Sequence, residues 1–477
     1  MKGRGKLLFS LLSLLLVVLI TAPLWVLPVV GAILPGNSHE NDYTAAIVDK
    51  YDRLNGVKGK KIVFVGGSSL PFGLKCELIE SELPGYTAVD FGLYASLGTV
   101  VMMDLSLSGI SEGDIVILAP ETDPQLYSDF FTPRLFRTAI GDRTDLLASL
   151  SPARRRKTAL AYYPVLFDRL RERNDLPVPD SETYARSSLN EYGDMALTRK
   201  RNQMPDGFDA SKTVTLNVLL DRGFFDEVNA YAKKVREKGA TLLFWFPPIN
   251  EAAVRFSDKE ATRFAKELAD ALDCPILGDV RDTVYEPGYF YDTNYHLNDD
   301  GAVMHTATTI KKIKDYLGLD PTVAFYVPPA PEYGYSGEIT TDGTFLFQGP
   351  SSDGEAYALY GVEDGVRAAL TDVTVPATYN GLPVRDILSE CFMGCKNMTS
   401  LTIPESVIAL GSDVFVGCGK LTVIKLKGTS PFGLPDEDAF KGASPSLKIY
   451  YPRTAGNAYT GGYTWPNYQS LLAPYDP

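Results

Sequence analysis

The sequence has few of the residues that bind metals or nucleic acids. Its 477 residues include 3 histidines and 5 cysteines, and no two cysteines have the C-x-x-C spacing of a zinc site. The net charge of −13 argues against nucleic acid, because phosphate binding needs a basic surface. We therefore expect no metal, no organic cofactor and no nucleic acid partner. Two short basic runs, 154–157 and 199–201, are predicted to be solvated charges.

Long hydrophobic runs are also absent after the first residues of the chain. Lys2, Arg4 and Lys6 precede an uncharged stretch from Leu7 to Leu34. As a helix this stretch would span about 42 Å, more than the ~30 Å hydrocarbon core of a bilayer. We expect residues 1–36 to be an uncleaved anchor of a single-pass cell-membrane protein whose bulk lies outside the cytoplasm. A long signal peptide is the alternative. The lack of a second such run excludes a transporter.

Strand-like and helical patterns alternate between Lys60 and Leu319. The expected strands are 62–65, 88–91, 115–119, 242–246 and 276–277, and the expected helices are 74–83, 97–108, 224–238, 258–272 and 299–317. This alternation predicts a parallel sheet covered by helices on both faces, an α/β domain that we place at residues 37–322. Residues 120–222 interrupt the alternation and are predicted to add helices and a lobe on the substrate side.

Residues suited to chemistry follow the ends of these strands. Ser68 stands on a glycine turn after the first strand, Gly92 follows the second, Glu121 the third, and His296 lies on a loop after the last. Ligands of parallel sheets bind at the carboxyl ends of the strands, so we expect these residues at one edge. A serine on such a turn and a loop histidine are the minimum for nucleophilic acyl chemistry. The alternatives are a turn serine, a structural histidine and, for Glu121, a loop or N-cap carboxylate.

Two blocks carry a resemblance to a known family. Val65-Gly-Gly-Ser-Ser-Leu-Pro-Phe-Gly73 resembles the first block of the SGNH (GDSL-type) hydrolase superfamily, and Asp292-Thr-Asn-Tyr-His-Leu-Asn-Asp-Asp-Gly301 resembles its last block. The variant is most similar to membrane-anchored envelope members, including proteins of alginate O-acetylation and of teichoic acid D-alanylation. The resemblance covers about 60–319 and implies a three-layer, flavodoxin-like fold with esterase or O-acyltransferase activity.

The resemblance also assigns roles to individual residues. Ser68 matches the nucleophile, and its backbone N–H and that of Gly92 match donors of the oxyanion hole. His296 matches the general base, and Asn298 and Gly301 match the pattern that follows it.

Three positions depart from the family pattern. Gly67 replaces an Asp before the nucleophile, and Thr293 stands where the family has the Asp that precedes its His, so Asp292 is expected to orient His296 from a slightly different loop. Glu121 stands where the family has an Asn side-chain donor, and a carboxylate cannot donate a hydrogen bond to an oxyanion. Glu121 and Asn298 remain candidate pocket residues. We expect slow or specialised chemistry.

Residues 323–477 are predicted to be a proline-rich linker and a repeat domain. Short strand candidates at 373–375, 402–403 and 423–426 alternate with a recurring x-Phe-x-Gly motif that contains Phe392, Phe415 and Phe440. This period resembles the bacterial surface type of leucine-rich repeat over about 372–451, a β-solenoid in which these phenylalanines, Cys395 and Cys418 form the core. A Cys391–Cys395 bridge is the alternative for two of the thiols.

Two functions follow from these features. The leading hypothesis is an exported, membrane-anchored serine acyl hydrolase or acyltransferase. Its substrate would be O-acyl groups, with O-acetyl favoured, on envelope or extracellular glycans. The alternative is a surface binding or adhesion protein whose repeats engage a protein or glycan ligand while the α/β domain is idle.

Overall fold

The computed structural model describes most of the chain after residue 41. The exceptions are 123–129, 172–182, 205–206, 217–221, 331–337, 352–353, 435–438, 457 and 461–464, and before residue 42 only residues 13, 17, 18 and 21 are described. The predicted anchor from Leu7 to Leu34 therefore lies almost entirely outside the described residues. In the described part of the chain, no helix is long and apolar enough to cross a membrane.

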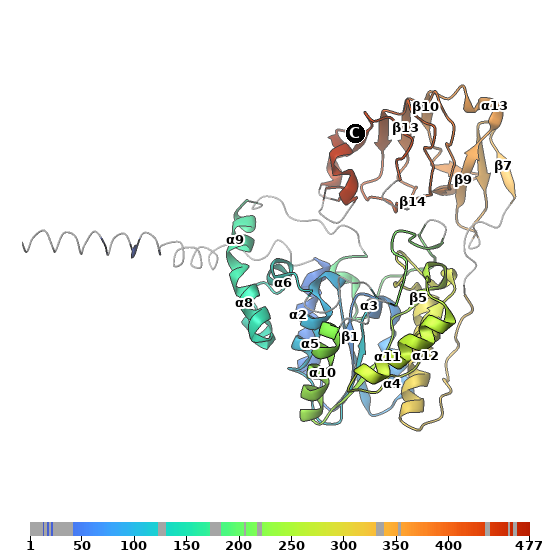
Figure 1. The fold of residues 1–477 in the computed structure, drawn as a ribbon. Helices are drawn as coiled ribbons and strands as arrows, with labels where there is room; N and C mark the ends of the chain where they lie inside the picture. Colours follow the sequence, from blue (N-terminus) through green and yellow to red (C-terminus); the bar gives the residue numbers. More distant parts are fainter. Residues whose placement is uncertain are drawn as a thin grey trace, which may run out of the picture.

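A parallel sheet forms the centre of the α/β domain (Figure 1). Its strands are β1 (Lys60–Gly66), β2 (Tyr86–Gly92), β3 (Ile115–Ala119) and β4 (Thr241–Phe244). They lie in the order β2-β1-β3-β4, and Ile276 extends the sheet through a parallel bridge to Phe244. This is the order of flavodoxin-like doubly wound sheets, whose ligands bind where the order reverses, between β1 and β3. The strands are almost entirely buried because helices cover both faces.

Helices pack on each face of this sheet (Figure 1). One face carries α2 (Ile47–Gly56), α5 (Thr99–Ser106) and α10 (Arg222–Glu237), and the other carries α4 (Cys76–Glu82), α11 (Asp258–Ala271) and α12 (Asp299–Tyr316). Short strands β5 (Ile249–Asn250) and β6 (Val284–Tyr285) pair beside them. The five helices predicted for this region are present, and their ends differ from the prediction by no more than two residues. Their amphipathic patterns are local signals, which explains the agreement.

The region 120–222 divides into two parts. Its helices are α6 (Pro133–Ala139), α7 (Thr144–Ser149), α8 (Pro152–Leu160) and α9 (Tyr162–Arg171). They pack on one another and beside α5, at the end of the helical layer (Figure 1). The later residues of the region run instead to the carboxyl edge of the sheet, where Tyr184 and Arg199 lie. The region thus contains helices, as the sequence predicted, and only its later part lies at the carboxyl edge of the sheet, where a lobe was predicted.

Two arginines correct the expectation of solvated basic runs. Arg154 donates to Asp104 at 2.7 Å and to Glu227 at 3.2 Å. Arg199 is 1% exposed and bonds to the Phe72 carbonyl oxygen and to Asp299. Burial lowers the pKa of Arg199, and the nearby Asp299 opposes that shift. A charge is buried only with partners, and these partners are distant in sequence.

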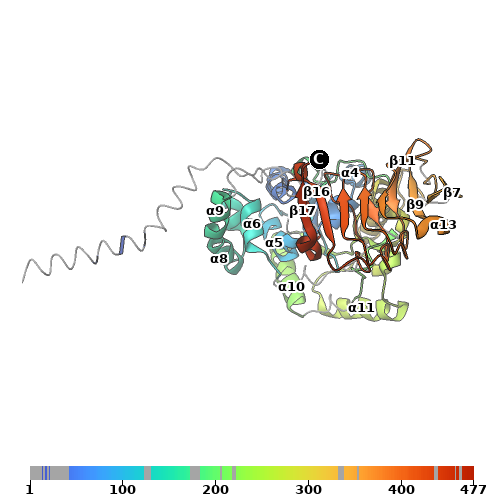
Figure 2. The same ribbon diagram turned by 90° about the horizontal axis from the view of Figure 1, so that it is seen from above.

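The repeat domain is built on a second parallel sheet (Figure 2). Its strands are β10 (Asp372–Thr374), β13 (Ser400–Ile403), β15 (Val423–Leu426), β16 (Lys448–Pro452) and β17 (Leu472–Tyr475), in that order. The three predicted strands are neighbouring rungs, as expected for a solenoid in which each repeat buries its apolar face against the next.

A stack of phenylalanines fills the interior of these coils. The Phe392 and Phe415 rings lie 6.4 Å apart and 4° from parallel, and Phe415 and Phe440 lie 5.8 Å apart at 13°. Cys391, Cys395 and Cys418 are free and buried, so the alternative of a Cys391–Cys395 bridge is not realised. Burial raises the pKa of the Cys418 thiol to about 12, which fits a packing role.

The amino-terminal end of the solenoid is covered by an antiparallel meander. It consists of β7 (Ile339–Thr341), β8 (Phe345–Gln348) and β9 (Tyr357–Val362), and β9 pairs in parallel with β12 (Leu382–Ile387). The remaining short elements are α13 (Asp364–Arg367), β11 (Thr378–Tyr379) and β14 (Ala409–Leu410). An array of so few repeats needs such a cap to cover its terminal apolar face.

Each of the two units has its own hydrophobic core, and polar contacts join them. The large apolar cluster of the α/β domain and that of the repeat domain share no residue. Lys200 lies 3.4 Å from Glu355 and Arg201 lies 4.0 Å from Asp386, both across the junction. In Figure 1 the repeat domain lies above the edge of the α/β domain near which α3 (Ser69–Gly73) is labelled.

Candidate active site

The turn after β1 positions Ser68 at the reversal of strand order. β1 ends at Gly66, α3 begins at Ser69, and Ser68 between them is 5% exposed. A side chain at Gly67 would place its Cβ 2.5 Å from Glu121 Oε1. A larger residue at this position would therefore require the Glu121 side chain to move away from the turn.

The loop before α12 positions His296. Asn298 caps α12 by accepting from the Gly301 N–H at 2.9 Å, and its amide donates to the Gly288 and Phe290 carbonyl oxygens. A Cβ on Gly301 would collide with the Tyr289 carbonyl oxygen, so the Asn-x-x-Gly pattern serves the helix start. Asn298 is fully buried, and its side-chain hydrogen bonds go to the backbone, so the structure places this candidate pocket residue at the start of α12.

Ser68, His296 and Asp292 form a continuous hydrogen-bonded chain. The Ser68 Oγ lies 2.8 Å from His296 Nε2, and His296 Nδ1 lies 2.8 Å from Asp292 Oδ1. The Thr293 hydroxyl accepts from the backbone N–H of His296 at 3.0 Å, which closes the turn. The turn thereby lets a carboxylate four residues before the histidine reach its ring. The His296 and Asp292 side chains are 6% and 20% exposed.

Aromatic side chains hold the histidine ring. Phe72, from the same block as Ser68, stacks on His296 with ring centroids 4.0 Å apart and 9° between the planes. Tyr184 donates to Asp292 Oδ2 at 2.6 Å and lies 3.2 Å from His296 Nδ1. Arg199 lies over the Phe72 ring at 5.2 Å. Rotation of the imidazole away from Ser68 would have to disrupt this packing.

Glu121 borders the nucleophile from the end of β3. Its Oε1 accepts from the Ser69 N–H at 2.8 Å and from the Ser68 hydroxyl at 3.4 Å. The next residue, Thr122, meets the Tyr295 hydroxyl at 2.5 Å, so the end of β3 also contacts the histidine loop. Glu121 therefore lies beside Ser68, where its ionised carboxylate is a hydrogen-bond acceptor and cannot donate.

Gly92 is in the predicted place, but its N–H is engaged. The glycine packs against the Gly67–Leu70 turn, and its N–H donates to Asp90 Oδ1 at 2.7 Å. Burial raises the pKa of Asp90 to about 7, and its ion pair with Lys50 opposes that shift. An oxyanion could accept from Gly92 only by displacing this carboxylate. The prediction of Gly92 as a ready oxyanion donor therefore disagrees with the observed hydrogen bond.

Sequence reasoning did not identify Phe72, Tyr184 or Arg199 as parts of the site. Phe72 lies four residues after Ser68 in the same short block, so its proximity to the nucleophile could have been predicted from the sequence. Tyr184 and Arg199 come from the irregular region 120–222, where no periodicity or spacing relates them to residues 292–299. His305, by contrast, has the structural role expected of a helix histidine. It bonds to the Tyr285 hydroxyl at 3.1 Å, and burial lowers its pKa to about 3.

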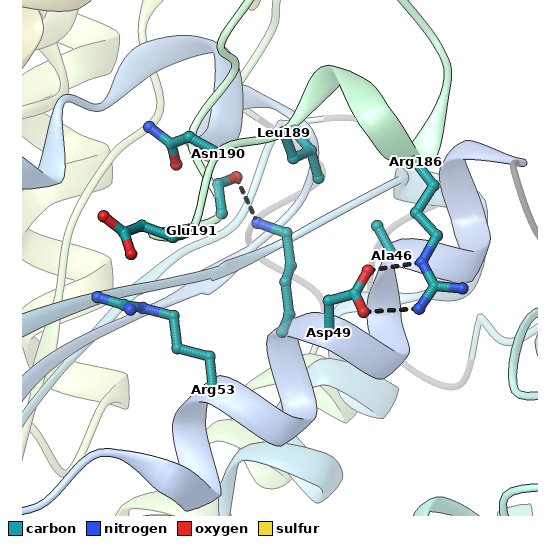
Figure 3. Close-up of a pocket in the computed structure, with 9 residues that line it drawn as sticks. Ala46, Asp49, Arg53, Arg186, Leu189, Asn190 and Glu191 are labelled. Carbon is teal, nitrogen blue, oxygen red and sulfur yellow. Dashed lines mark hydrogen bonds and ion pairs between the residues drawn. The ribbon is translucent and has the colours of Figure 1, made fainter.

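A separate cavity of about 270 Å³ lies beside α2 (Figure 3). Two of its positively charged side chains are paired, because Arg186 bonds to both oxygens of Asp49 and Lys50 forms an ion pair with Asp90 at 3.3 Å. Neither Ser68 nor His296 lines it. Among the described residues, no group of three or more His, Cys, Asp or Glu side chains could hold a metal ion.

Comparison with known proteins identifies the repeat domain. Residues 368–460 match the family model "BspA type Leucine rich repeat region" in six copies, so this part of the chain is a leucine-rich repeat domain of that type. The match leaves the α/β domain outside it, and the resemblance of that domain to SGNH hydrolases remains a prediction. A search of curated proteins found no match.

Solved structures similar to this chain are leucine-rich repeat proteins. The one from T. pallidum is 20% identical, and the match covers 25% of this chain and 57% of that protein. A protein from Bacteroides capillosus is 24% identical over 24% of this chain and 72% of that one. A leucine rich cell surface protein from Faecalibacterium prausnitzii is 20% identical over 29% of this chain and 30% of that one. Each TM-score is 0.17.

Proposed function

We propose that the α/β domain is a serine acyl hydrolase or acyltransferase. The observation that carries this proposal is the hydrogen-bonded chain from Ser68 through His296 to Asp292, with both steps at 2.8 Å. A hydroxyl, an imidazole and a carboxylate in this order are the parts of a nucleophile activated by a general base that a third group orients. Their position at the reversal of strand order is where open α/β sheets bind ligands.

The geometry suits a two-step acyl exchange. Ser68 Oγ forms a bond to the ester carbonyl carbon while its proton moves to His296 Nε2. The bond from that carbon to the leaving oxygen then breaks, and Nε2 returns the proton to the leaving alcohol. Water or an acceptor hydroxyl next attacks the acyl-serine and gives its proton to Nε2, and Ser68 leaves with that proton. Asp292 keeps Nδ1 protonated throughout and stabilises the imidazolium form.

The oxyanion formed in each step needs donors. The backbone N–H of Ser68 adjoins the reacting oxygen, whereas the N–H groups of Ser69 and Gly92 already donate to Glu121 and Asp90. Loss of one oxyanion donor typically costs ~10²–10³ in rate. We therefore propose slow or specialised turnover of O-acyl groups, with O-acetyl favoured, on envelope or extracellular glycans. This substrate class rests on the resemblance to envelope O-acylation proteins.

The test is hydrolysis of a model acetyl ester by the purified full-length chain. We expect measurable turnover that falls by at least about 10³-fold in Ser68→Ala and in His296→Gln. Both substitutions leave the backbone unchanged, so circular dichroism should report the same fold. Turnover that persists in Ser68→Ala would refute the assignment of the nucleophile.

The repeat domain favours a second candidate, a surface binding protein with an idle α/β domain. The specific observation is the BspA-type repeat match at 368–460, since solenoids present extended surfaces for partners. Glu121 beside the nucleophile also fits an idle site. This candidate predicts that wild type and Ser68→Ala bind an acetylated envelope glycan equally, and that neither releases acetate. Release of acetate by the wild type alone would reject it.

We also propose that Leu7 to Leu34 anchors the protein in the cell membrane. The support is the length of this uncharged stretch and the basic residues before it. Fractionation of cells that express the full chain should place it in the membrane pellet at high salt. Recovery of a chain shortened by about thirty residues in the soluble fraction would favour the signal peptide instead.

A further inference from the structure

We propose that Tyr184 is a positioning residue that holds Asp292, and through it the tautomer of His296, in the arrangement that acyl transfer needs. The catalytic part of this inference rests on the proposed function. The geometric part does not, because it concerns the hydrogen bonds of the imidazole in the resting protein.

The two oxygens of Asp292 have different partners. Oδ1 lies 2.8 Å from His296 Nδ1, and Oδ2 accepts from the Tyr184 hydroxyl at 2.6 Å. The carboxylate is thus fixed at both ends by side chains from different parts of the sequence. A carboxylate with one bonded oxygen could rotate about its Cα–Cβ and Cβ–Cγ bonds, and the second bond removes that freedom.

The Tyr184 hydrogen bond matters because, in the described part of the chain, little else holds the Asp292 side chain in place. Asp292 lies four residues before His296 on an irregular loop, and its side chain is 20% exposed. Water can compete for such a carboxylate, and its swing would release the Nδ1 proton from its acceptor. His296 would then be free to adopt the other tautomer, in which Nε2 carries the proton and cannot accept from Ser68.

Tyr184 is suited to donate to Asp292. Burial and the adjacent Asp292 charge raise its pKa well above the ordinary value, so the hydroxyl stays protonated. Its ring is held by Phe72 at 5.8 Å and by Tyr43 at 5.6 Å, edge to face with the latter. The phenol is therefore oriented by packing, and removal of its oxygen alone should leave the ring in place.

The experiment compares Tyr184→Phe with the matched control Tyr43→Phe. Tyr43 lies in the same aromatic cluster, and its buried hydroxyl has no hydrogen-bond partner among the described residues, so its loss removes no contact to Asp292. The readouts are the ¹⁵N shifts of the His296 ring at a pH where it is neutral, assigned with His296→Gln, and the kcat and KM for a model ester. His305, which stays neutral, serves as an internal reference.

We expect the wild type and Tyr43→Phe to show the Nδ1–H tautomer, and Tyr184→Phe to show a substantial fraction of Nε2–H. We also expect Tyr184→Phe to lower kcat by about 10-fold with little change in KM, well short of the ~10⁴-fold loss typical when the triad carboxylate itself is neutralised. If Tyr184→Phe keeps the tautomer and the kcat of Tyr43→Phe, the inference is wrong. If no variant turns over ester but the tautomer still shifts in Tyr184→Phe, the proposed function fails and the positioning role stands.

Discussion

The repeat domain and the α/β domain are stabilised by contacts of different range. In the repeat domain each strand pairs with the strand of the next repeat, and the three phenylalanines stack with neighbours 23 and 25 residues away. In the α/β site, Ser68 meets a histidine 228 residues later, and Tyr184 meets a carboxylate 108 residues later. Short-range periodic contacts make a scaffold, whereas convergent long-range contacts build a reactive centre.

This difference implies that the two units should unfold independently of each other. Their apolar clusters share no residue, and the salt bridges across the junction are few and partly solvated. Solvent-exposed ion pairs contribute about 0–1 kcal/mol each. Damage to one core should therefore reach the other unit only weakly.

The largest effect is expected from Phe415→Ala. Phe415 touches the stacked rings on both sides and is fully buried, so its truncation should cost ~3–5 kcal/mol and unfold the repeat domain. Limited proteolysis with mass spectrometry should show cleavage after about residue 338 while the α/β domain resists. Tyr360→Ala, which removes an exposed aromatic from β9 in the same unit, serves as the control and should have little effect. Simultaneous digestion of both units would contradict the separation.

Two buried groups of the α/β domain should respond to acid in opposite directions. Protonation of His305 should weaken the domain, whereas Asp90, whose raised pKa lets the folded state bind a proton below about pH 7, should oppose that loss, so the His305 contribution is measured by comparison with a variant. Burial lowers the pKa of His305 from its ordinary 6.5 to about 3, so the unfolded state binds more protons between these two pH values. Stability from this group is complete above about pH 6.5 and is lost as the pH falls, by about 2 kcal/mol between pH 7 and pH 5. The repeat domain has no histidine.

Unit-resolved hydrogen exchange at the two pH values measures this loss. His305→Gln keeps a polar side chain near the Tyr285 hydroxyl but does not titrate, so about 2 kcal/mol of the acid sensitivity should disappear. An unchanged acid sensitivity in that variant would show that other groups control the response.

Glu121→Gln is expected to have a smaller effect, an increase in kcat for a model ester. The amide could accept from the Ser69 N–H as the carboxylate does and could also donate to an oxyanion. A newly placed donor should raise kcat for a model ester by about 10-fold, less than the ~10²–10³ of an optimised donor. Glu121→Ala removes the carboxylate without adding a donor. If the two variants turn over ester equally, the gain comes from loss of charge alone.

The comparison also explains which features the sequence could predict. The predicted helices, four of the five predicted strands of the α/β domain and the phenylalanine stack follow from hydrophobic periodicity and lie within two residues of their predicted places, whereas the fifth strand is a single bridge at Ile276. Elements such as α2 and the meander β7–β9 were not predicted individually. Ser68 and His296 were identified because short motifs surround them at the ends of sheet elements. These signals are local, and local signals are what a single sequence carries.

The remaining features depend on contacts that no local pattern encodes. Arg199 belongs to a basic run that looked solvated, yet Asp299 and the Phe72 carbonyl oxygen surround it. The Gly92 N–H is engaged because the Asp90 side chain folds back on it. Tyr184 contacts Asp292 because the irregular segment 183–204 folds back over the carboxyl edge of the sheet. Such polar partnerships are set by tertiary packing, which single-sequence patterns do not report.

The central claim is that Ser68 is an activated nucleophile, and covalent trapping tests it most directly. The full-length chain is treated with a fluorophosphonate at neutral pH, digested and sequenced by tandem mass spectrometry, with fragments that distinguish Ser68 from Ser69. We predict one adduct on Ser68, absent in Ser68→Ala and strongly reduced in His296→Gln. An unmodified Ser68, or equal labelling of Ser68 in wild type and His296→Gln, would contradict the account.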